Sequence, residues 1–581
     1  MVQINIGLGE MYLDLEEIRD ILKSTQTILA GSSAVVAQYS KEIGLPEIVN
    51  KLVTWDRSRK GISPGTLIQA LVINILGDRK ALYRVSEFYR DKDLETIFDE
   101  DVTADALNDS ALARALDKMH EAGCQKIFSE VALSAIAAHD VPIGPVHFDT
   151  TSMSVEGEYN GEEEDAISVT YGYSKDKRPD LKQIMFGVGS NHEGIPFFGQ
   201  VLSGNQDDMT WNSQVVEKID TIIPDEFISE VIYVSDCAMV TLDTLRKASS
   251  NDLKFISRMP ARFKLAGELA RASWVDEKPW TQMGKLSSGQ KAASYETKSY
   301  FSEIDGMPHR FVVVHSSTLD GRKKKALGKM MEAERAKIEK EASLLRRRDF
   351  VCEPDARRAL TRFMDKWQGG FHELSGHVTV GMEKEKREKR GRPRKDAPKP
   401  PVTVSFNADI KVAGVNEERL KKEQRIRSTF ILITNLMDEE EYPDGAILTE
   451  YKAQPTVENL FRFIKSPYVL GPVFVKKPSR VEALGYVLLM ALLIAMLLQR
   501  RVRENLAKEE TPLQIPGKVK TFMPTVRMIL DMLDTVKIQK LVIEGQTLRS
   551  WPEQDGLFDL SRLLRLAGVS KSAYTEPSWS T

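Results

Sequence analysis

The chain has 581 residues, of which 42% are hydrophobic, and 81 basic residues stand against 84 acidic ones. This length is too great for one core, and the near balance of charge excludes a global polycation, so any nucleic-acid binding must come from local basic surfaces. The three cysteines, Cys124, Cys237 and Cys352, have no paired spacing, which argues against a disulfide framework and a structural zinc site and favours a reducing cytoplasm.

Residues 1–140 are predicted to form a helical domain. Ser63 followed by Pro64 is an N-cap with proline in the first turn, and a second helix is expected from Asn108 to Gly123. A bundle of short helices either recognises DNA ends through one helix or serves in packing and assembly. Basic residues within 79–92 favour the first interpretation, and the acidic run 99–105 favours the second.

Residues 141–260 show the period of strands instead. The expected elements are, in order, strands at 146–148, 184–188 and 197–202, a helix at 213–223, a strand at 231–235, a helix at 239–248 and a strand at 255–258. This is the element order of an RNase H-like α/β fold, whose mixed sheet brings the first and fourth strands together. Asp149 and Asp236 end those two strands, so they should become neighbours.

Residues 261–440 are predicted to be a mostly β insertion that interrupts the RNase H-like unit before its last helix. Within it, residues 384–400 carry nine Lys or Arg against three acids, which predicts an exposed basic loop. Arg390, Arg392 and Arg394 lie in the run RGRPRK, which resembles an AT-hook that enters the minor groove. The alternative is a solubilising loop that touches phosphates without sequence preference.

Residues 441–500 are predicted to complete the core, and residues 451–465 read YKAQPTVENLFRFIK. Val457, Leu460, Phe461 and Ile464 fall on one face of a helix. Glu458 and Lys465 are two turns apart, so both can point along the same flank toward one site.

The two aspartates and Glu458 form a set of three carboxylates with no histidine or cysteine cluster nearby. Such a set selects Mg²⁺, with Mn²⁺ as a possible substitute. Two ions about 4 Å apart would serve an in-line displacement at phosphorus. The expected chemistry is therefore cleavage or transfer of polynucleotide strands.

Residues 501–581 are predicted to be helical. Just before them, residues 483–498 contain no charge, but a membrane span needs roughly 20 apolar residues. We therefore expect a buried helix, with a membrane anchor as the alternative. The N-terminal sequence lacks the basic start and apolar core of a signal peptide.

The whole pattern resembles the DDE insertion-sequence transposases with an RNase H-like core, in the branch marked by Tyr, two residues, Arg, three residues, Glu, six residues, Lys. Tyr451, Glu458 and Lys465 stand at that spacing, whereas Gln454 occupies the Arg position. Arg462, one turn after Glu458, is the candidate substitute. The segment 172–184, GYSKDKRPDLKQI, also resembles this group.

The resemblance implies a bacterial or archaeal, cytoplasmic and nucleoid-associated transposase that works as a homodimer. Its substrates would be double-stranded DNA, both the terminal inverted repeats of its element and the target. Asp149, Asp236 and Glu458 would be the catalytic metal ligands, and Tyr451 and Lys465 would contact the DNA backbone. Two alternatives remain: a derived DNA-binding protein that no longer cuts, and an RNase H-like nuclease acting on branched DNA.

Overall fold

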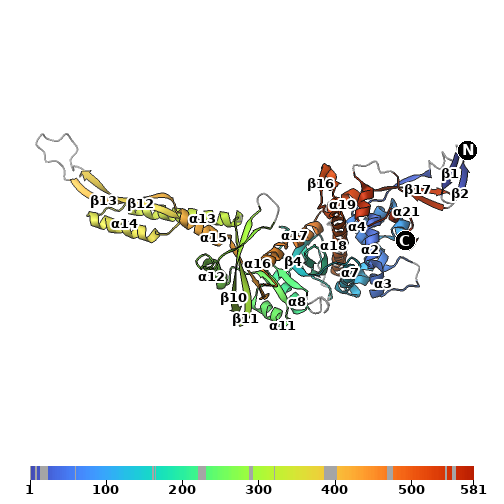
Figure 1. Ribbon diagram of the computed structural model, residues 1–581, viewed down its shortest axis with the longest axis horizontal. Coiled ribbons are helices and arrows are strands. Elements are labelled where there is room, and N and C mark those ends of the chain that lie inside the picture. The colour runs from blue at the N-terminus through green and yellow to red at the C-terminus, as the bar shows by residue number, and fades with distance from the viewer. Residues whose placement is uncertain are drawn as a thin grey trace. The chain divides into compact units, whose positions relative to one another are not determined.

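The computed structural model divides into two compact units (Figure 1). The first comprises Met1–Ser257, Thr434–Leu436 and Thr449–Thr581, and the second comprises Arg258–Ile433 and Met437–Leu448. The structure describes residues 2–6, 9–13, 24–58, 61–159, 163, 165–219, 230–286, 292–318, 321–384, 402–466, 475–543, 546–552 and 558–580.

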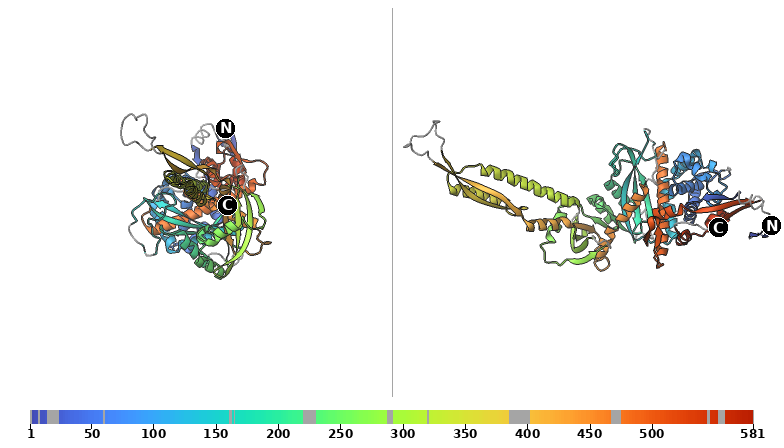
Figure 2. Two further views of the ribbon diagram at one scale, coloured as in Figure 1. Left: turned by 90° about the vertical axis from the view of Figure 1, so that its left-hand side faces the viewer. Right: turned by 90° about the horizontal axis from the view of Figure 1, so that it is seen from above.

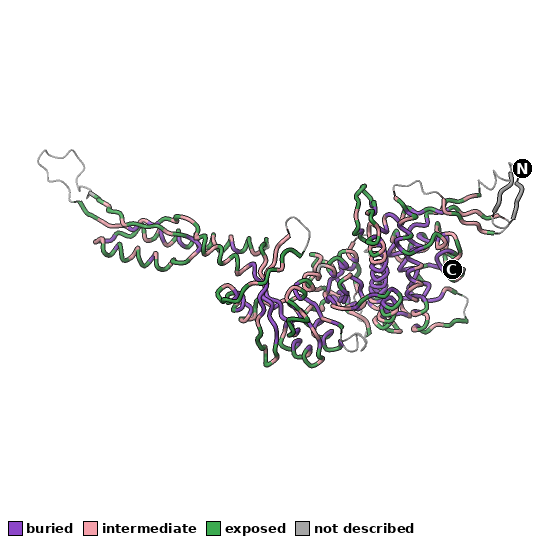
Figure 3. The backbone as a smooth tube through the Cα atoms, in the orientation of Figure 1, coloured by how far each residue is buried: buried purple, intermediate pink, exposed green. Residues whose placement is uncertain are grey.

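The first unit is built around α18 (Pro478–Leu506), whose side chains from Ala483 to Leu498 are all buried. This helix packs against α4 (Pro64–Leu76), α6 (Asp109–Glu121), α7 (Cys124–Ala138) and strand β6 (Pro196–Leu202). It is long and apolar enough to cross a membrane, but 94% of its most apolar stretch is buried inside the protein, as Figure 3 shows. Its apolar surface is therefore covered by the protein's own elements.

Helices α4 and α6 begin where the sequence supplies caps. The Ser63 hydroxyl accepts a hydrogen bond from the Thr66 N–H, and the Asn108 side chain accepts one from the Ala111 N–H, which confirms both predicted helix starts. Three further helices complete this part: α2 (Ser33–Glu42), α3 (Leu45–Leu52) and α5 (Val85–Arg90).

The first unit also contains five strands in the order β6–β5–β4–β7–β8. Their bounds are Pro145–Val155 for β4, Lys182–Asn191 for β5, Ile232–Ser235 for β7 and Lys254–Arg258 for β8. Strands β4, β5 and β6 pair antiparallel, and β7 runs parallel to both β4 and β8. Helices α8 (Asp208–Glu217) and α11 (Leu242–Ser250) complete the predicted mixed α/β order, and the fold class is confirmed.

The two faces of β4 carry different chemistry because successive side chains alternate. Phe148 stacks on Tyr233 with ring centroids 4.3 Å apart, and it also contacts Trp211 of α8. His147 and Asp149 therefore project from the opposite face. Asp149, the first acid of the candidate site, lies on that face.

The second unit contains several helices as well as strands, so the prediction of a mostly β insertion was incomplete. Strands β9 (Thr281–Lys285), β10 (Ser294–Ile304), β11 (Met307–Ser316) and β14 (Thr429–Thr434) form one part, in the order β14–β11–β10–β9. Helices α12 (Lys264–Ala272) and α15 (Glu417–Ser428) belong to the same unit.

A long hairpin of β12 (His372–Lys384) and β13 (Val402–Val415) forms the other part of the second unit. Helices α13 (Gly321–Arg346) and α14 (Glu353–Trp367) lie along it (Figure 2). Ile338, Ala342, Phe363 and Ile410 form their shared core. The sequence did not reveal α14 because only Ala356 and Phe363 of that helix are buried.

Both ends of the chain were predicted to be helical, and both also contain strands. Strand β3 (Gln26–Leu29) pairs with β17 (Lys537–Ile543), which in turn pairs with β18 (Gln546–Ser550). Two shorter hairpins are formed by β1 (Val2–Ile6) with β2 (Gly9–Leu13) and by β15 (Leu513–Ile515) with β16 (Val519–Thr521). Helices α19 (Val526–Leu533) and α20 (Leu560–Leu566) fit the prediction.

Candidate active site

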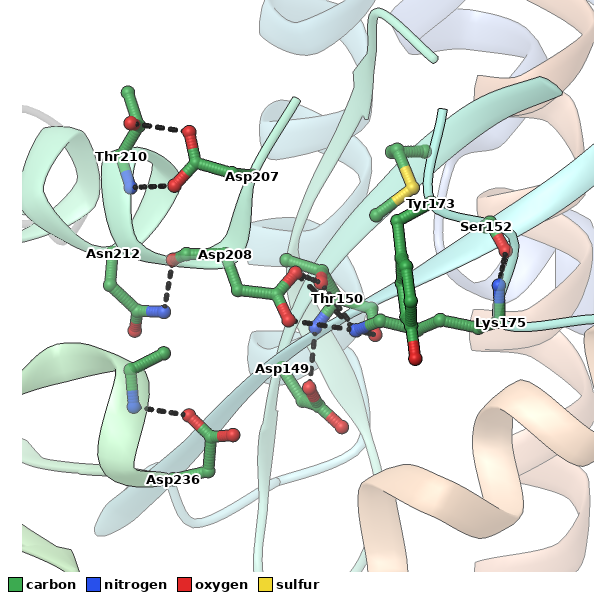
Figure 4. Close-up of polar contacts among 12 residues, drawn as sticks. Asp149, Thr150, Ser152, Tyr173, Lys175, Asp207, Asp208, Thr210, Asn212 and Asp236 are labelled. Atoms are coloured by element: carbon green, nitrogen blue, oxygen red, sulfur yellow. Dashed lines mark hydrogen bonds and ion pairs between the residues drawn. The ribbon is translucent and has the colours of Figure 1, made fainter. Parts of the chain in front are cut away.

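The structure brings Asp149 and Asp236 together through the parallel pairing of β4 and β7. Phe148 of β4 pairs with Ser235 of β7. Asp149 directly follows Phe148 in the sequence, and Asp236 directly follows Ser235. Figure 4 shows both carboxylates beside this end of β4. Two acids nearly 90 residues apart in the sequence thus lie side by side because their strands are neighbours.

One oxygen of each carboxylate accepts a hydrogen bond from a nearby backbone N–H. Asp149 accepts a hydrogen bond of 2.7 Å from Thr150, and Asp236 accepts one of 2.8 Å from Ala238, at the start of a short 3₁₀ turn. Within the described chain, we find no hydrogen bond to the second oxygen of either carboxylate. Those oxygens remain available as ligands.

A third carboxylate, Asp208, lies beside the pair and was not singled out from the sequence. It stands in the first turn of α8, where an acid reads as an ordinary helix-start residue. The Lys175 ammonium lies 3.1 Å from Asp208 and donates to the Thr150 carbonyl at 2.8 Å (Figure 4). Thr150 also hydrogen bonds to Asp208 through its hydroxyl. The sequence signal for this part of the site was the basic segment 172–184, because it contains Lys175, the partner of Asp208.

The electrostatics of the site are visible in the pKa of Asp149, which rises from 3.8 to about 6. Burial is the largest cause, and the negative charges of Asp236 and Asp208 raise the pKa further. The Lys175 ammonium and the Thr150 N–H act in the opposite direction. Asp149 is therefore a largely desolvated carboxylate, and a cation at this position would stabilise its ionised form.

The predicted helix of the third acid is α17 (Pro455–Ile464), which packs against β4 and β5. Val457, Leu460, Phe461 and Ile464 are buried as predicted, and Glu458 is exposed in the first turn. In the described residues, no three acidic, histidine or cysteine side chains are grouped closely enough to hold a metal ion. The structure therefore joins Asp149 with Asp236 but leaves the Glu458 carboxylate outside that pair.

Tyr451 and Glu458 do not share one continuous helix. Tyr451 belongs to α16 (Asp444–Lys452), and Pro455 starts α17 because proline fits the first turn of a helix but not its interior. Gln454, at the position where the resembling motif has Arg, lies at this junction.

His147 is fully buried two residues before Asp149, and its Nε2 atom lies 2.6 Å from Oε1 of Glu450 on α16. The two side chains tie α16 to β4. The structure thus packs this histidine within the strand and gives it a defined partner.

The predicted DNA-contacting residues fall in three places. The Lys465 ammonium, at the end of α17, lies 2.5 Å from Asp176. Arg462 is exposed on α17 and lines a groove, and Tyr451 is half-buried. Arg390, Arg392 and Arg394 lie outside the described residues.

The donor set of the site suits a hard divalent cation. Asp149 and Asp236 offer oxygen ligands only, which is the donor type that Mg²⁺ prefers. Mg²⁺ keeps several waters and is often held by one or two carboxylates together with substrate phosphates. The pair of Asp149 and Asp236 fits such an ion in the type and number of its oxygen ligands.

In comparisons with known proteins, the family described as "Domain of unknown function (DUF4277)" matches residues 26–133. No protein with a curated description matches the chain. Among solved structures, the chain is similar to a piggyBac transposase synaptic complex with hairpin DNA, determined by cryo-EM. The TM-score is 0.37 at 9% identity, over 85% of this chain and 78% of that chain.

Proposed function

We propose that the protein is the transposase of a mobile DNA element of the insertion-sequence type. It would bind the terminal inverted repeats, cut the DNA at the element ends and join them to target DNA, as a homodimer in the cytoplasm. The observation that carries this proposal is the pairing of Asp149 with Asp236 across parallel strands, in a sheet whose neighbouring helix carries Glu458.

Asp149, Asp236 and Glu458 would hold Mg²⁺, or Mn²⁺ in its place. Such ions supply charge stabilisation for in-line displacement at phosphorus. Glu458 is exposed on the flank of α17 that also carries Lys465, so its long side chain is free to turn toward the aspartates. Both cleavage and strand transfer are displacements at phosphorus, so one site serves both reactions.

The chain's own residues position the DNA. Lys465 and Tyr451 contact the backbone of the element end, and Arg462 contributes where the motif has lost its arginine. Lys175 stays next to Thr150 and Asp208 and offers a positive charge to a phosphate entering the site. The pKa of Asp149, about 6, means that its carboxylate is mostly ionised at neutral pH even before a cation binds.

The test uses a duplex with the sequence that flanks the coding region, incubated with the full-length protein and Mg²⁺. Asp149→Asn, Asp236→Asn and Glu458→Gln should each lower nicking by about 100-fold or more while DNA binding persists. Asp180→Asn is the matched control, because Asp180 is exposed and paired with Arg178. Undiminished nicking by the Asp149 and Asp236 variants would overturn the proposal.

Metal binding is tested separately through stability. A ligand that binds only the folded state raises the melting temperature. Mg²⁺ should therefore raise the Tm of the wild-type protein, and this rise should disappear in the variant that lacks both Asp149 and Asp236. An equal rise in both proteins would place the ion elsewhere.

A further inference from the structure

A groove of about 830 Å³ lies in the first unit, along α17, α18 and α19 and the turn between β5 and β6. It borders the flank of α17 that faces away from the candidate active site. The four buried residues of α17 fix the orientation of the helix, and Glu458 and Lys465 project from one side of that buried face. Asn459, Phe463 and Ser466 project from the other side and line the groove.

Four arginines line this groove, and two of them have acidic partners. Arg500 lies 2.7 Å from Glu193 and 2.8 Å from Glu504. Arg527 lies 2.5 Å from Asp531. The positive charge of these two side chains is therefore offset within the protein.

Arg462 and Arg503 differ, because among the described residues neither forms an ion pair. Arg462 is exposed on α17. Arg503 is half-buried on α18, and its Nε atom donates to the Pro524 carbonyl at 2.8 Å. Burial lowers the pKa of Arg503. A partly desolvated guanidinium without an anion is costly, and an anion from outside would relieve that cost.

Apolar side chains form part of the groove walls. Phe463 of α17, Met496 of α18 and Met523 before α19 contribute to its walls, and Met523 is 63% exposed. A ligand for this groove therefore combines negative charge with apolar surface. A sugar–phosphate backbone has both, since its phosphates can pair with arginines while its deoxyribose rings cover apolar side chains.

We propose that the groove binds the sugar–phosphate backbone of one DNA strand, with phosphates on Arg462 and Arg503. The inference rests on the proposed function and adds a second DNA contact to it. The active-site flank and the groove flank of α17 are separated by the thickness of one helix, roughly 10 Å. A strand that passes from one flank of α17 to the other would cover that distance in about three nucleotides, at about 3.4 Å per step.

The test measures DNA affinity by fluorescence anisotropy as a function of salt, with full-length protein and the duplex from the flank of the coding region. Arg462→Ala and Arg503→Gln should each reduce the slope of log K against log salt by about 1. Arg503→Lys keeps the positive charge, so this variant should retain most of the wild-type slope. Glu504→Gln should increase affinity, because it removes a negative charge from the rim. Arg335→Ala is the control: it removes an exposed arginine of α13 that is paired with Glu339, and the slope should not change.

A photoreactive benzophenone side chain at Asn459 locates the strand directly. The expected product after irradiation is a covalent DNA adduct. Cross-linking to a second copy of the chain, which would indicate an acidic protein segment in the groove, overturns the inference. Slopes that stay unchanged in Arg462→Ala and Arg503→Gln also overturn it. If the wild-type protein still nicks DNA in that case, only the groove assignment fails; a wild-type protein that neither binds nor nicks DNA removes the proposed function as well.

Discussion

The ammonium nitrogen of Lys465 lies 2.5 Å from a carboxylate oxygen of Asp176, and both side chains are about a quarter exposed. Lys465 belongs to the motif on α17, whereas Asp176 belongs to the basic segment that follows β4. The next residue toward the N-terminus, Lys175, contacts Thr150 and Asp208. Two adjacent residues of one segment therefore hold both the helix of Glu458 and the strand of Asp149.

This contact predicts that Asp176 competes with a DNA phosphate for Lys465. Asp176→Asn should strengthen DNA binding several-fold and steepen its salt dependence by about 1, because one more ammonium becomes available. The measurement is anisotropy at several salt concentrations. Glu339→Gln, on α13 and paired with Arg335, is the control and should change neither quantity. Weaker binding by Asp176→Asn would show that the contact organises the site instead of blocking it.

The raised pKa of Asp149 predicts a pH-dependent stability. The folded-state pKa of about 6 lies above the ordinary value of 3.8, so folding favours the protonated carboxyl. Stability is therefore lost as the pH rises from 3.8 to about 6, and the penalty is fully present above that range. Asparagine carries no charge and removes the penalty.

Asp149→Asn should accordingly be more stable than the wild type at pH 7.5 in EDTA, by about 1 kcal/mol after allowing for solvent screening of a half-buried group. The difference should vanish near pH 3.5. Urea unfolding at both pH values measures it. Asp180→Asn should give no such gain, because hydrogen bonds from Arg178 lower the pKa of Asp180. A variant less stable than the wild type at pH 7.5 would contradict the assigned electrostatics.

The buried contact between His147 and Glu450 predicts a stability cost that a conservative variant avoids. Glu450→Ala removes the partner of a buried ring nitrogen, and leaving such a group without a partner costs about 1–3 kcal/mol. Glu450→Gln keeps an oxygen for the hydrogen bond and should retain most of the stability. Glu441→Ala, at an exposed position, is the control. Equal losses in the two Glu450 variants would argue that the negative charge is essential.

The buried environment of α18 predicts that its apolar side chains stabilise the protein's own core. Leu489 is fully buried, so Leu489→Ala should lower the free energy of unfolding by about 2–5 kcal/mol. Val519→Ala, at a position 55% exposed, should change it little. Alkaline extraction of cell membranes should leave the wild-type protein in the supernatant; retention in the pellet would revive the membrane-anchor alternative.

The predictions that came from short-range pattern were the most accurate. The caps at Ser63 and Asn108, the apolar face of α17 and the order of strands and helices from β4 to β8 all depend on nearby residues. Helix α14 and strands β17 and β18 were missed because few of their side chains are buried, so their hydrophobic period is weak. The pairing of β3 with β17 joins segments more than 500 residues apart, and no local pattern encodes it.

The sequence by itself determined the element order from β4 to β8, the chemistry of the available side chains and the placement of Glu458 and Lys465 on one flank of a helix, because these follow from backbone periodicity and residue type. Only the tertiary structure decided which charges meet. It set Asp149 beside Asp236, added Asp208 and Lys175 to them, left Glu458 exposed and paired Lys465 with Asp176. Electrostatic interactions depend on distance and burial, and both are fixed only when remote segments pack together.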